Sequence, residues 1–323
     1  MSDRLIQAAI VLLGVPAALV GYIALVEWFV QRLPDKQQPR VRPWLWIGPA
    51  LALLAFFLVY PTLNTIYLSF LNAKSTNFVG LDNYAYALTT SDSLNAMRNN
   101  LLWLVFFTGV TVALGLLIAV LTDRVPYESV AKALIFLPMA ISSVAAGVIW
   151  KFMYDYRPAG QPQTGTLNAI VGSVGVTPQP WLIQQPWNNG WLIFVGVWMM
   201  AGFAMVILSA GLKGISDEVL EAARVDGANE WNLFWSIKVP MLSSTIAVVA
   251  TTIVIAALKT FDIVYVMTNG NYNTDVVARR MYTELFNTRN YGRASAIAVV
   301  LLVAIIPIMI INIRRFQEQE AIR

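Results

Sequence analysis

The residue types that most often carry out catalysis are missing from this chain. Cysteine and histidine are both absent from its 323 residues, which removes thiolate nucleophiles, disulfides, the commonest general base and the commonest metal ligand. The phosphate-binding pattern Gly-x-x-x-x-Gly-Lys-Ser/Thr is absent as well. We therefore expect no catalytic residue, no metal site and no cofactor in this chain, and any ATP-driven step must belong to another polypeptide.

Two charged side chains fall inside a long apolar run and could do chemistry within a membrane. Lys259 and Asp262 lie three residues apart in the run 243–267. On one helix they would share a face and could pair, which would reduce the cost of burying both charges. Two interpretations remain open at this point: a structural ion pair, or an element of a solute pathway or gate.

A polar segment of about thirty residues, 213–241, is the third candidate. It is too long to be a plain connector. Ser216 suits a helix N-cap, and Asp217 and Glu218 place negative charge in the first turn, where the helix dipole favours it. Gly227 allows a turn, and Pro240 marks the end of a second amphipathic piece. The segment therefore predicts two short helices at the membrane surface, with apolar positions at Val219, Leu220, Ala222, Ala223, Trp231, Phe234 and Trp235.

The elements that position these residues are apolar runs long enough to cross a bilayer. The chain is 58% hydrophobic and 12% charged, whereas soluble domains are about 25% charged. Its charges form no basic stripe, so we expect no nucleic-acid partner. A spanning helix needs about 20 apolar residues, and continuous runs of this length exclude barrel strands. The sequence predicts an all-α integral membrane protein with seven spans, at 6–30, 44–70, 101–122, 131–154, 190–212, 243–267 and 292–313.

The distribution of Lys and Arg in short loops predicts the orientation. The loop after the first span carries four positive residues, and the segment before that span carries one. This places the N-terminus outside and the C-terminus in the cytoplasm, although four arginines fall on the outer side. The residues concerned are Arg4 before the first span; Arg32, Lys36, Arg40 and Arg42 in the first loop; Arg279, Arg280, Arg289 and Arg293 on the outer side; and Arg314, Arg315 and Arg323 at the C-terminus.

The segment 213–241 resembles the EAA loop of binding-protein-dependent ABC importer permeases. The matching residues are Glu221-Ala222-Ala223, Asp226-Gly227-Ala228, Phe234, Ile237 and Pro240. A second proline that family members often carry shortly afterwards is replaced here by Ser243-Ser244. The resemblance implies that Glu221, Ala222, Ala223, Asp226, Gly227 and Ala228 dock on a separate cytoplasmic ATPase, which binds the ATP and Mg.

Further motifs resemble the sugar-importing, maltose-permease-like branch of these permeases. They are Tyr60-Pro61, Phe78-Val79-Gly80-Leu81-Asp82-Asn83-Tyr84, Leu137-Pro138, Leu167-Asn168 with Trp181-Leu182, and Leu258-Lys259-Thr260-Phe261-Asp262. The run Gly270-Asn271-Tyr272-Asn273-Thr274 looks like the α-glucoside and glucosylglycerol permeases.

The resemblance divides the chain into an additional N-terminal helix with its loop, 1–42, and a six-span type I permease domain, 43–323. It implies a bacterial inner-membrane protein that imports a sugar. The expected partners are a second homologous permease, two ABC ATPase subunits and an extracytoplasmic solute-binding protein.

The solute contacts of related permeases map onto two spans of this chain. Carried over by register, they are Trp198, Met200, Phe203, Ile253, Ala256 and Ala257, to which Lys259 and Asp262 are added as pathway candidates. Phe203 could stack on a sugar ring. The second set is apolar where a disaccharide binder can carry Ser and Asn, so the partner permease is expected to supply most contacts. Helix packing is the alternative role for each of these residues.

Three other functions are compatible with a multispan chain. An ion-coupled secondary transporter needs intramembrane carboxylates, and Asp262 is the single convincing one. It would also leave the segment 213–241 unexplained. A membrane enzyme needs paired carboxylates or a metal cluster at a membrane face, and none is visible. A permease for another small solute stays within the same family.

Overall fold

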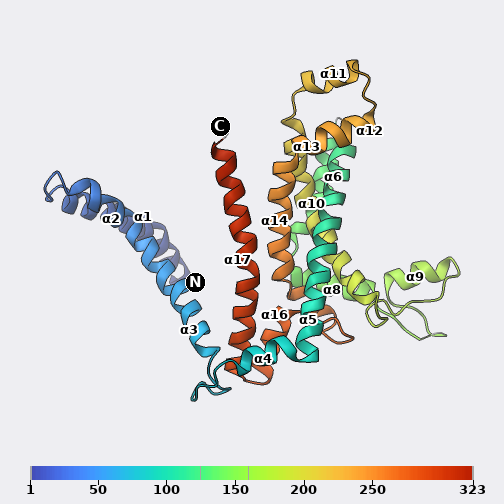
Figure 1. Cartoon of the computed structure of the whole chain (residues 1–323), viewed down its shortest axis with the longest axis horizontal. Coiled ribbons are helices and arrows are strands. Elements are labelled where there is room, and N and C mark those ends of the chain that lie inside the picture. The colour runs from blue at the N-terminus through green and yellow to red at the C-terminus, as the bar shows by residue number, and fades with distance from the viewer. Residues whose placement is uncertain (1, 124, 159, 322–323) are drawn as a thin grey trace. The chain divides into compact units, whose positions relative to one another are not determined.

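The computed structural model describes residues 2–123, 125–158 and 160–321 (Figure 1). Within these ranges the secondary structure is helical, with a single isolated bridge between Leu71 and Phe78. The chain divides into two compact units, Met1–Thr65 and Ile66–Arg323. Arg323, one of the basic residues that predict the orientation, lies outside the described residues, as does residue 1.

The number of helices that could cross a membrane agrees with the predicted fold. Among the described residues, five continuous helices are long and apolar enough, and two bent helix pairs raise the number to as many as seven. The continuous spans are Ile10–Val30, Gln38–Leu68, Ser91–Leu121, Asn188–Lys213 and Tyr291–Ile311. The bent pairs are Glu128–Ala140 with Ser143–Met153, and Glu230–Met241 with Ser243–Leu258.

The first unit is built from helices whose side chains are almost all exposed. It contains α1 (Ser2–Val30), α2 (Gln38–Leu54), the π-helical turn η1 (Ala55–Val59) and the start of α3 (Tyr60–Leu68). An ion pair between Glu27 and Arg42 and an edge-to-face contact of Tyr22 with Trp46, 6.5 Å between ring centroids, connect α1 to α2. The exposed apolar side chains suit a lipid environment, in which no hydrophobic core is needed.

The second unit surrounds one central helix, α10 (Asn188–Lys213). Two-thirds of its apolar window is buried, far more than in any other candidate span. Gly202 shows how closely the neighbours approach, because an added Cβ would lie 2.5 Å from the carbonyl oxygen of Ile135. The elements packed against it are η2 (Trp103–Phe107), α6 (Thr108–Leu121), α7 (Glu128–Phe136), η3 (Leu137–Ala140), α8 (Ser143–Met153), α14 (Ser243–Leu258) and α15 (Asp262–Met267). The unit also contains α4 (Asp82–Thr89), α5 (Ser91–Leu102), α9 (Thr166–Ser173), α16 (Val277–Tyr282), η5 (Thr283–Asn287) and α17 (Tyr291–Ala321).

Two of the predicted spans are not continuous helices. The run 131–154 bends by 98° between η3 and α8. Pro138 lies in η3 just after α7, and the hydroxyl of Ser142 then caps α8 by accepting a hydrogen bond from the N–H of Ala145 (3.2 Å). The run 243–267 ends its first helix at Leu258 and begins α15 at Asp262. Hydropathy identifies both runs, but it does not resolve the direction of the backbone within them.

Buried asparagines organise the end of this unit that lies away from the segment 213–241 (Figure 1). Asn168, which is fully buried, donates to the carbonyls of Asp155 and Gln179 and accepts from the indole N–H of Trp181. It lies in the short helix α9. Asn83 donates to the carbonyls of Ser69 and Leu71 in the same way. These contacts give a structural reason for two of the motifs found in the sequence.

Candidate functional site

The segment 213–241 forms two short helices joined by a tight turn, as predicted. The helix α11 (Asp217–Val225) is followed by α12 (Glu230–Leu233), η4 (Phe234–Lys238) and α13 (Val239–Met241). Gly227 turns the chain with a φ of +88°, which side-chain-bearing residues rarely adopt. An ion pair between Arg224 and Glu230, 3.1 Å, joins the two helices across this turn. In Figure 1, α11 lies across the end of α10 and α14.

The caps of the two short helices differ from the sequence prediction. Ser216 occupies the N-cap position of α11, but its side chain makes no capping hydrogen bond. The negative charges of Asp217 and Glu218 therefore stabilise this terminus without a hydroxyl cap. Asn229, which the sequence analysis did not single out, caps α12 by accepting from the N–H of Asn232 at 2.8 Å. The second helix accordingly begins at Glu230.

The six residues of the predicted ATPase-coupling set lie at one end of the unit and reach solvent. Glu221, Ala222, Asp226 and Gly227 are exposed, and Ala223 and Ala228 are half-buried. No atom lies within 4 Å of a Cβ built on Gly227. The small residues therefore leave an open surface that another backbone can approach.

The predicted apolar face of this segment is only partly buried. Leu220 is buried, whereas Val219 is 41% exposed. Val225, which we did not single out, is 87% exposed, and Trp231 and Trp235 are 70% and 51% exposed. Together these four exposed apolar side chains mark a surface that has no cover within this chain, which is typical of an interaction site.

An ion-pair network connects the base of the segment to the helix α7. Glu128 accepts from Lys213, the last residue of α10, at 2.7 Å, and it also pairs with Lys132. Lys132 additionally donates to the hydroxyl of Ser209. The spacing of Glu128 and Lys132 is visible in the sequence as an i, i+4 pair, but the third member, Lys213, is brought in only by the fold.

A cavity of about 150 Å³ collects several of the predicted pathway residues. Its walls come from η2, the start of α8, α10 and the break between α14 and α15. Met200, Ala256, Lys259 and Asp262 all line it. Two aromatic side chains outside the predicted pathway set, Trp103 and Phe107, line it as well. The buried indole N–H of Trp103 has no acceptor among the described residues.

The other four predicted pathway residues do not line this cavity. Ile253 and Ala257 are fully buried in the core of the unit. Trp198 packs edge-to-face on Trp150, with 5.5 Å between ring centroids, and Phe203 is half-buried against the same core. In this chain their contacts are those of helix packing.

Lys259 and Asp262 do not share a helix face, which corrects the sequence expectation. Lys259 is the C-cap of α14, and Phe261 has a φ of −142° and a ψ of −59°, outside the helical range. Lys259 is exposed, and Asp262 is half-buried at the start of α15. Among the described residues no ion pair links the two side chains. Asp262 instead lies in the first turn of a helix, where a negative charge is favoured. Both side chains face the same cavity.

Three comparisons with known proteins agree with this geometry. Residues 111–319 match the family model of the binding-protein-dependent transport system inner membrane component. The chain is 58% identical, over 86% of its length and the whole of the relative, to the osmoprotective compounds uptake permease protein GgtC of Synechocystis. It is 49% identical, over 85% of its length and 82% of the relative, to the alpha-glucoside transport system permease protein AglF of Rhizobium meliloti.

A solved structure shares the fold at low sequence identity. A chain of the bacterial alginate ABC transporter, determined in complex with a periplasmic protein, superposes with a TM-score of 0.73. It is 22% identical, and the superposition covers 87% of this chain and 95% of that one. The bent spans, the exposed segment 213–241 and the relatives agree with one another. The chain therefore belongs to the family of binding-protein-dependent transport system inner membrane components.

Proposed function

We propose that this chain is the permease subunit of an ATP-binding cassette importer for a sugar or a sugar-like solute of the α-glucoside, trehalose, sucrose or glucosylglycerol type. The observation that carries the proposal is the segment 213–241, where a small-residue turn stands open to solvent at the end of the spans. The printed names of the two relatives, an osmoprotective-compound permease and an alpha-glucoside permease, support the solute class.

A separate ATPase supplies the energy in this proposal. The surface formed by Glu221, Ala222, Asp226 and Gly227 docks on that subunit, together with the exposed apolar side chains of α11 and α12. The importer contains two such ATPase subunits, which hold the ATP and Mg, and an extracytoplasmic binding protein delivers the solute. Movement of the docked helices reaches the spans through Lys213, since its ion pair with Glu128 connects the segment to α7.

The cavity at the break between α14 and α15 has the chemistry that a sugar needs. Phe107 supplies an aromatic surface, the Trp103 indole supplies a free N–H donor, and Lys259 and Asp262 supply charged groups that can hydrogen-bond hydroxyls. Its volume of about 150 Å³ is below the roughly 300–1,000 Å³ of ordinary ligand pockets. A second, homologous permease therefore completes the site.

Copurification tests this proposal directly. The tagged chain is isolated from its native membrane in mild detergent, the bound chains are identified, and ATP hydrolysis is measured with candidate sugars and the binding protein. We expect a second permease and an ATPase to copurify, with hydrolysis stimulated by the sugar-loaded binding protein. A lone chain that is indifferent to ATP would contradict the proposal and would favour an ion-coupled transporter, with Asp262 the residue to test next. Stimulation by a non-sugar solute alone would contradict the solute class.

A further inference from the structure

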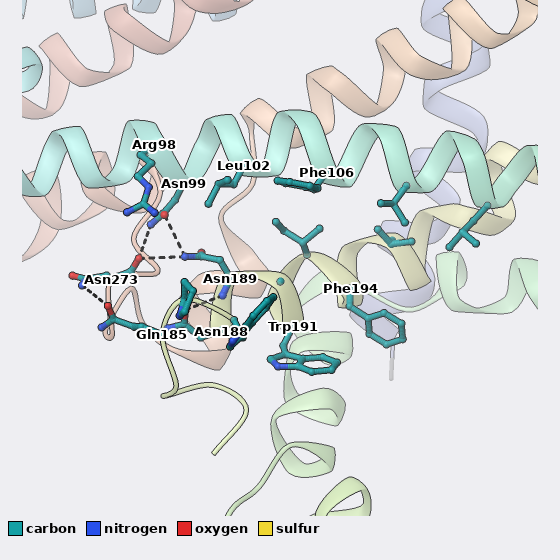
Figure 2. Close-up of a pocket in the computed structure, with 17 residues that line it drawn as sticks. Arg98, Asn99, Leu102, Phe106, Gln185, Asn188, Asn189, Trp191, Phe194 and Asn273 are labelled. Atoms are coloured by element: carbon teal, nitrogen blue, oxygen red, sulfur yellow. Dashed lines mark hydrogen bonds between the residues drawn. The ribbon is translucent and has the colours of Figure 1, made fainter. Parts of the chain in front are cut away.

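A second and larger pocket lies along α10 and shares no lining residue with the cavity at the break between α14 and α15. It has a volume of about 630 Å³ and runs between the α5–α6 helix and α10 (Figure 2). Four side chains spaced by four residues, Leu102, Phe106, Val110 and Leu114, form one wall. At 1.5 Å per residue this wall is about 18 Å long, which is similar to the roughly 15 Å depth of one leaflet of the hydrocarbon core.

One end of this trough is polar and carries a cation without a counter-ion. Arg98 is exposed, and it makes no ion pair or hydrogen bond with any residue that the structure describes. Beside it, Asn99, Asn189 and Asn273 are linked by hydrogen bonds, seen as dashed lines in Figure 2. Asn189 is 8% exposed, and its Oδ1 has no hydrogen-bond donor. This end therefore offers a positive charge beside a hydrogen-bonded polar cluster.

The depth of the trough distinguishes its occupant from the transported solute. Val110 and Leu114 belong to the apolar span Ser91–Leu121, and Val197 on the opposite wall belongs to the span Asn188–Lys213. The middle of the trough is therefore at hydrocarbon depth, and a polyol there would lose its hydrogen bonds to water. Trp187, 68% exposed at the polar end, is of the residue type that gathers at the headgroup level.

From these observations we propose that the trough is a binding site for an anionic phospholipid, and phosphatidylglycerol is the probe that tests it. One acyl chain lies along Leu102, Phe106, Val110 and Leu114, and the phosphate pairs with Arg98. The bound lipid would fix α5 against α10 in the leaflet away from the segment 213–241.

Native mass spectrometry of the assembled transporter tests the headgroup contact. Detergent-purified complexes are titrated with dioleoyl-phosphatidylglycerol or dioleoyl-phosphatidylcholine, and the bound lipids are counted. We expect retention of phosphatidylglycerol in preference to phosphatidylcholine, and a loss of roughly tenfold in affinity in Arg98→Gln, because a charge-assisted contact is removed. Arg289→Gln is the matched control, since Arg289 is also exposed but does not line the trough. Equal retention by Arg98→Gln and the control would overturn the proposal.

A second measurement, photolabelling by the lipid, does not require a substitution of Arg98. A phosphatidylglycerol with a photoreactive acyl chain is expected to label the segment 102–114 in the unaltered complex. Because the chain has no cysteine, Val110→Cys introduces a unique thiol into the trough. Efficient crosslinking of this thiol to another protein chain of the complex, with no lipid labelling of 102–114, would show a protein interface in place of a lipid site and would also overturn the proposal.

Discussion

At the scale of single residues, the asparagines at the helix ends hold the fold together more than their sequence positions suggest. Asn168 makes four hydrogen bonds, two as donor and two as acceptor, to groups 11 and 13 residues away. Sequence patterns place Asn in loops because of its local turn chemistry. They do not reveal that Asn99 and Asn189, which are 90 residues apart, are hydrogen-bonded to each other at 3.2 Å. Pairs of asparagines at the start of long apolar runs, such as 99–100 and 188–189, are the signal that could have indicated this.

Replacing Asn168 by Ala should open the segment 155–189. The substitution removes four part-buried hydrogen bonds, among them those from the Gln179 N–H and to the Asp155 carbonyl, and each costs about 0.5–1.5 kcal/mol. We expect protease cleavage within 155–189 to rise more than tenfold, because cleavage follows the population of the open form. Asn232→Ala is the control, since that side chain is exposed. Equal cleavage of the two variants would contradict this role of Asn168.

At the scale of elements, the apolar runs predicted the spans well but not their breaks. A hydropathy window registers composition, whereas the 98° bend before α8 depends on Pro138 and on the cap by Ser142. The break at Lys259–Phe261 similarly places Lys259 and Asp262 at a cavity and not on one helix face. The two short helices of the segment 213–241 were predicted correctly because Gly227 and the charged first turn are local features that need no tertiary information.

The turn between α11 and α12 depends on backbone conformation at Gly227. Gly227→Val should place a β-branched residue at a φ of +88°, which costs about 1–3 kcal/mol even though no neighbouring atom clashes. This cost lowers the population of the native turn by a factor of roughly 5–140. We expect the amount of ATPase that copurifies to fall accordingly, measured by quantitative mass spectrometry. Gly227→Asn tolerates a positive φ better and should retain most of the ATPase. The same loss in both variants would show that the side chain, and not the backbone conformation, is the cause.

At the scale of the whole molecule, the arrangement of polar ends separates two roles. The segment 213–241 lies at one end of the spans, and the asparagine-rich loops lie at the other. In our proposal the first end faces the cytoplasmic ATPase and the second faces the solute-binding protein. The composition alone predicted a multispan helical membrane protein, because 58% hydrophobic residues leave too little polar surface for a soluble domain of this length.

Single cysteines can test the orientation because the chain has none of its own. Gln161 and Lys36 are both exposed, and we propose that they lie on opposite sides of the membrane. In intact spheroplasts, a membrane-impermeant maleimide should label Gln161→Cys at once and Lys36→Cys only after permeabilisation. The unaltered chain is the blank. Labelling of Lys36→Cys from outside would contradict a cytoplasmic first loop.

The central claim is that Glu221 and its neighbours couple a separate ATPase to solute movement. The most direct test is the ratio of solute imported to ATP hydrolysed, measured in proteoliposomes of the complete transporter. The account predicts that Glu221→Lys stays in the membrane and lowers this ratio about tenfold or more, since a contact to a charged group is lost. Asp82→Lys makes the same reversal of charge at an exposed position at the other end of the spans. This control should leave the ratio unchanged. A normal ratio in Glu221→Lys would contradict the account.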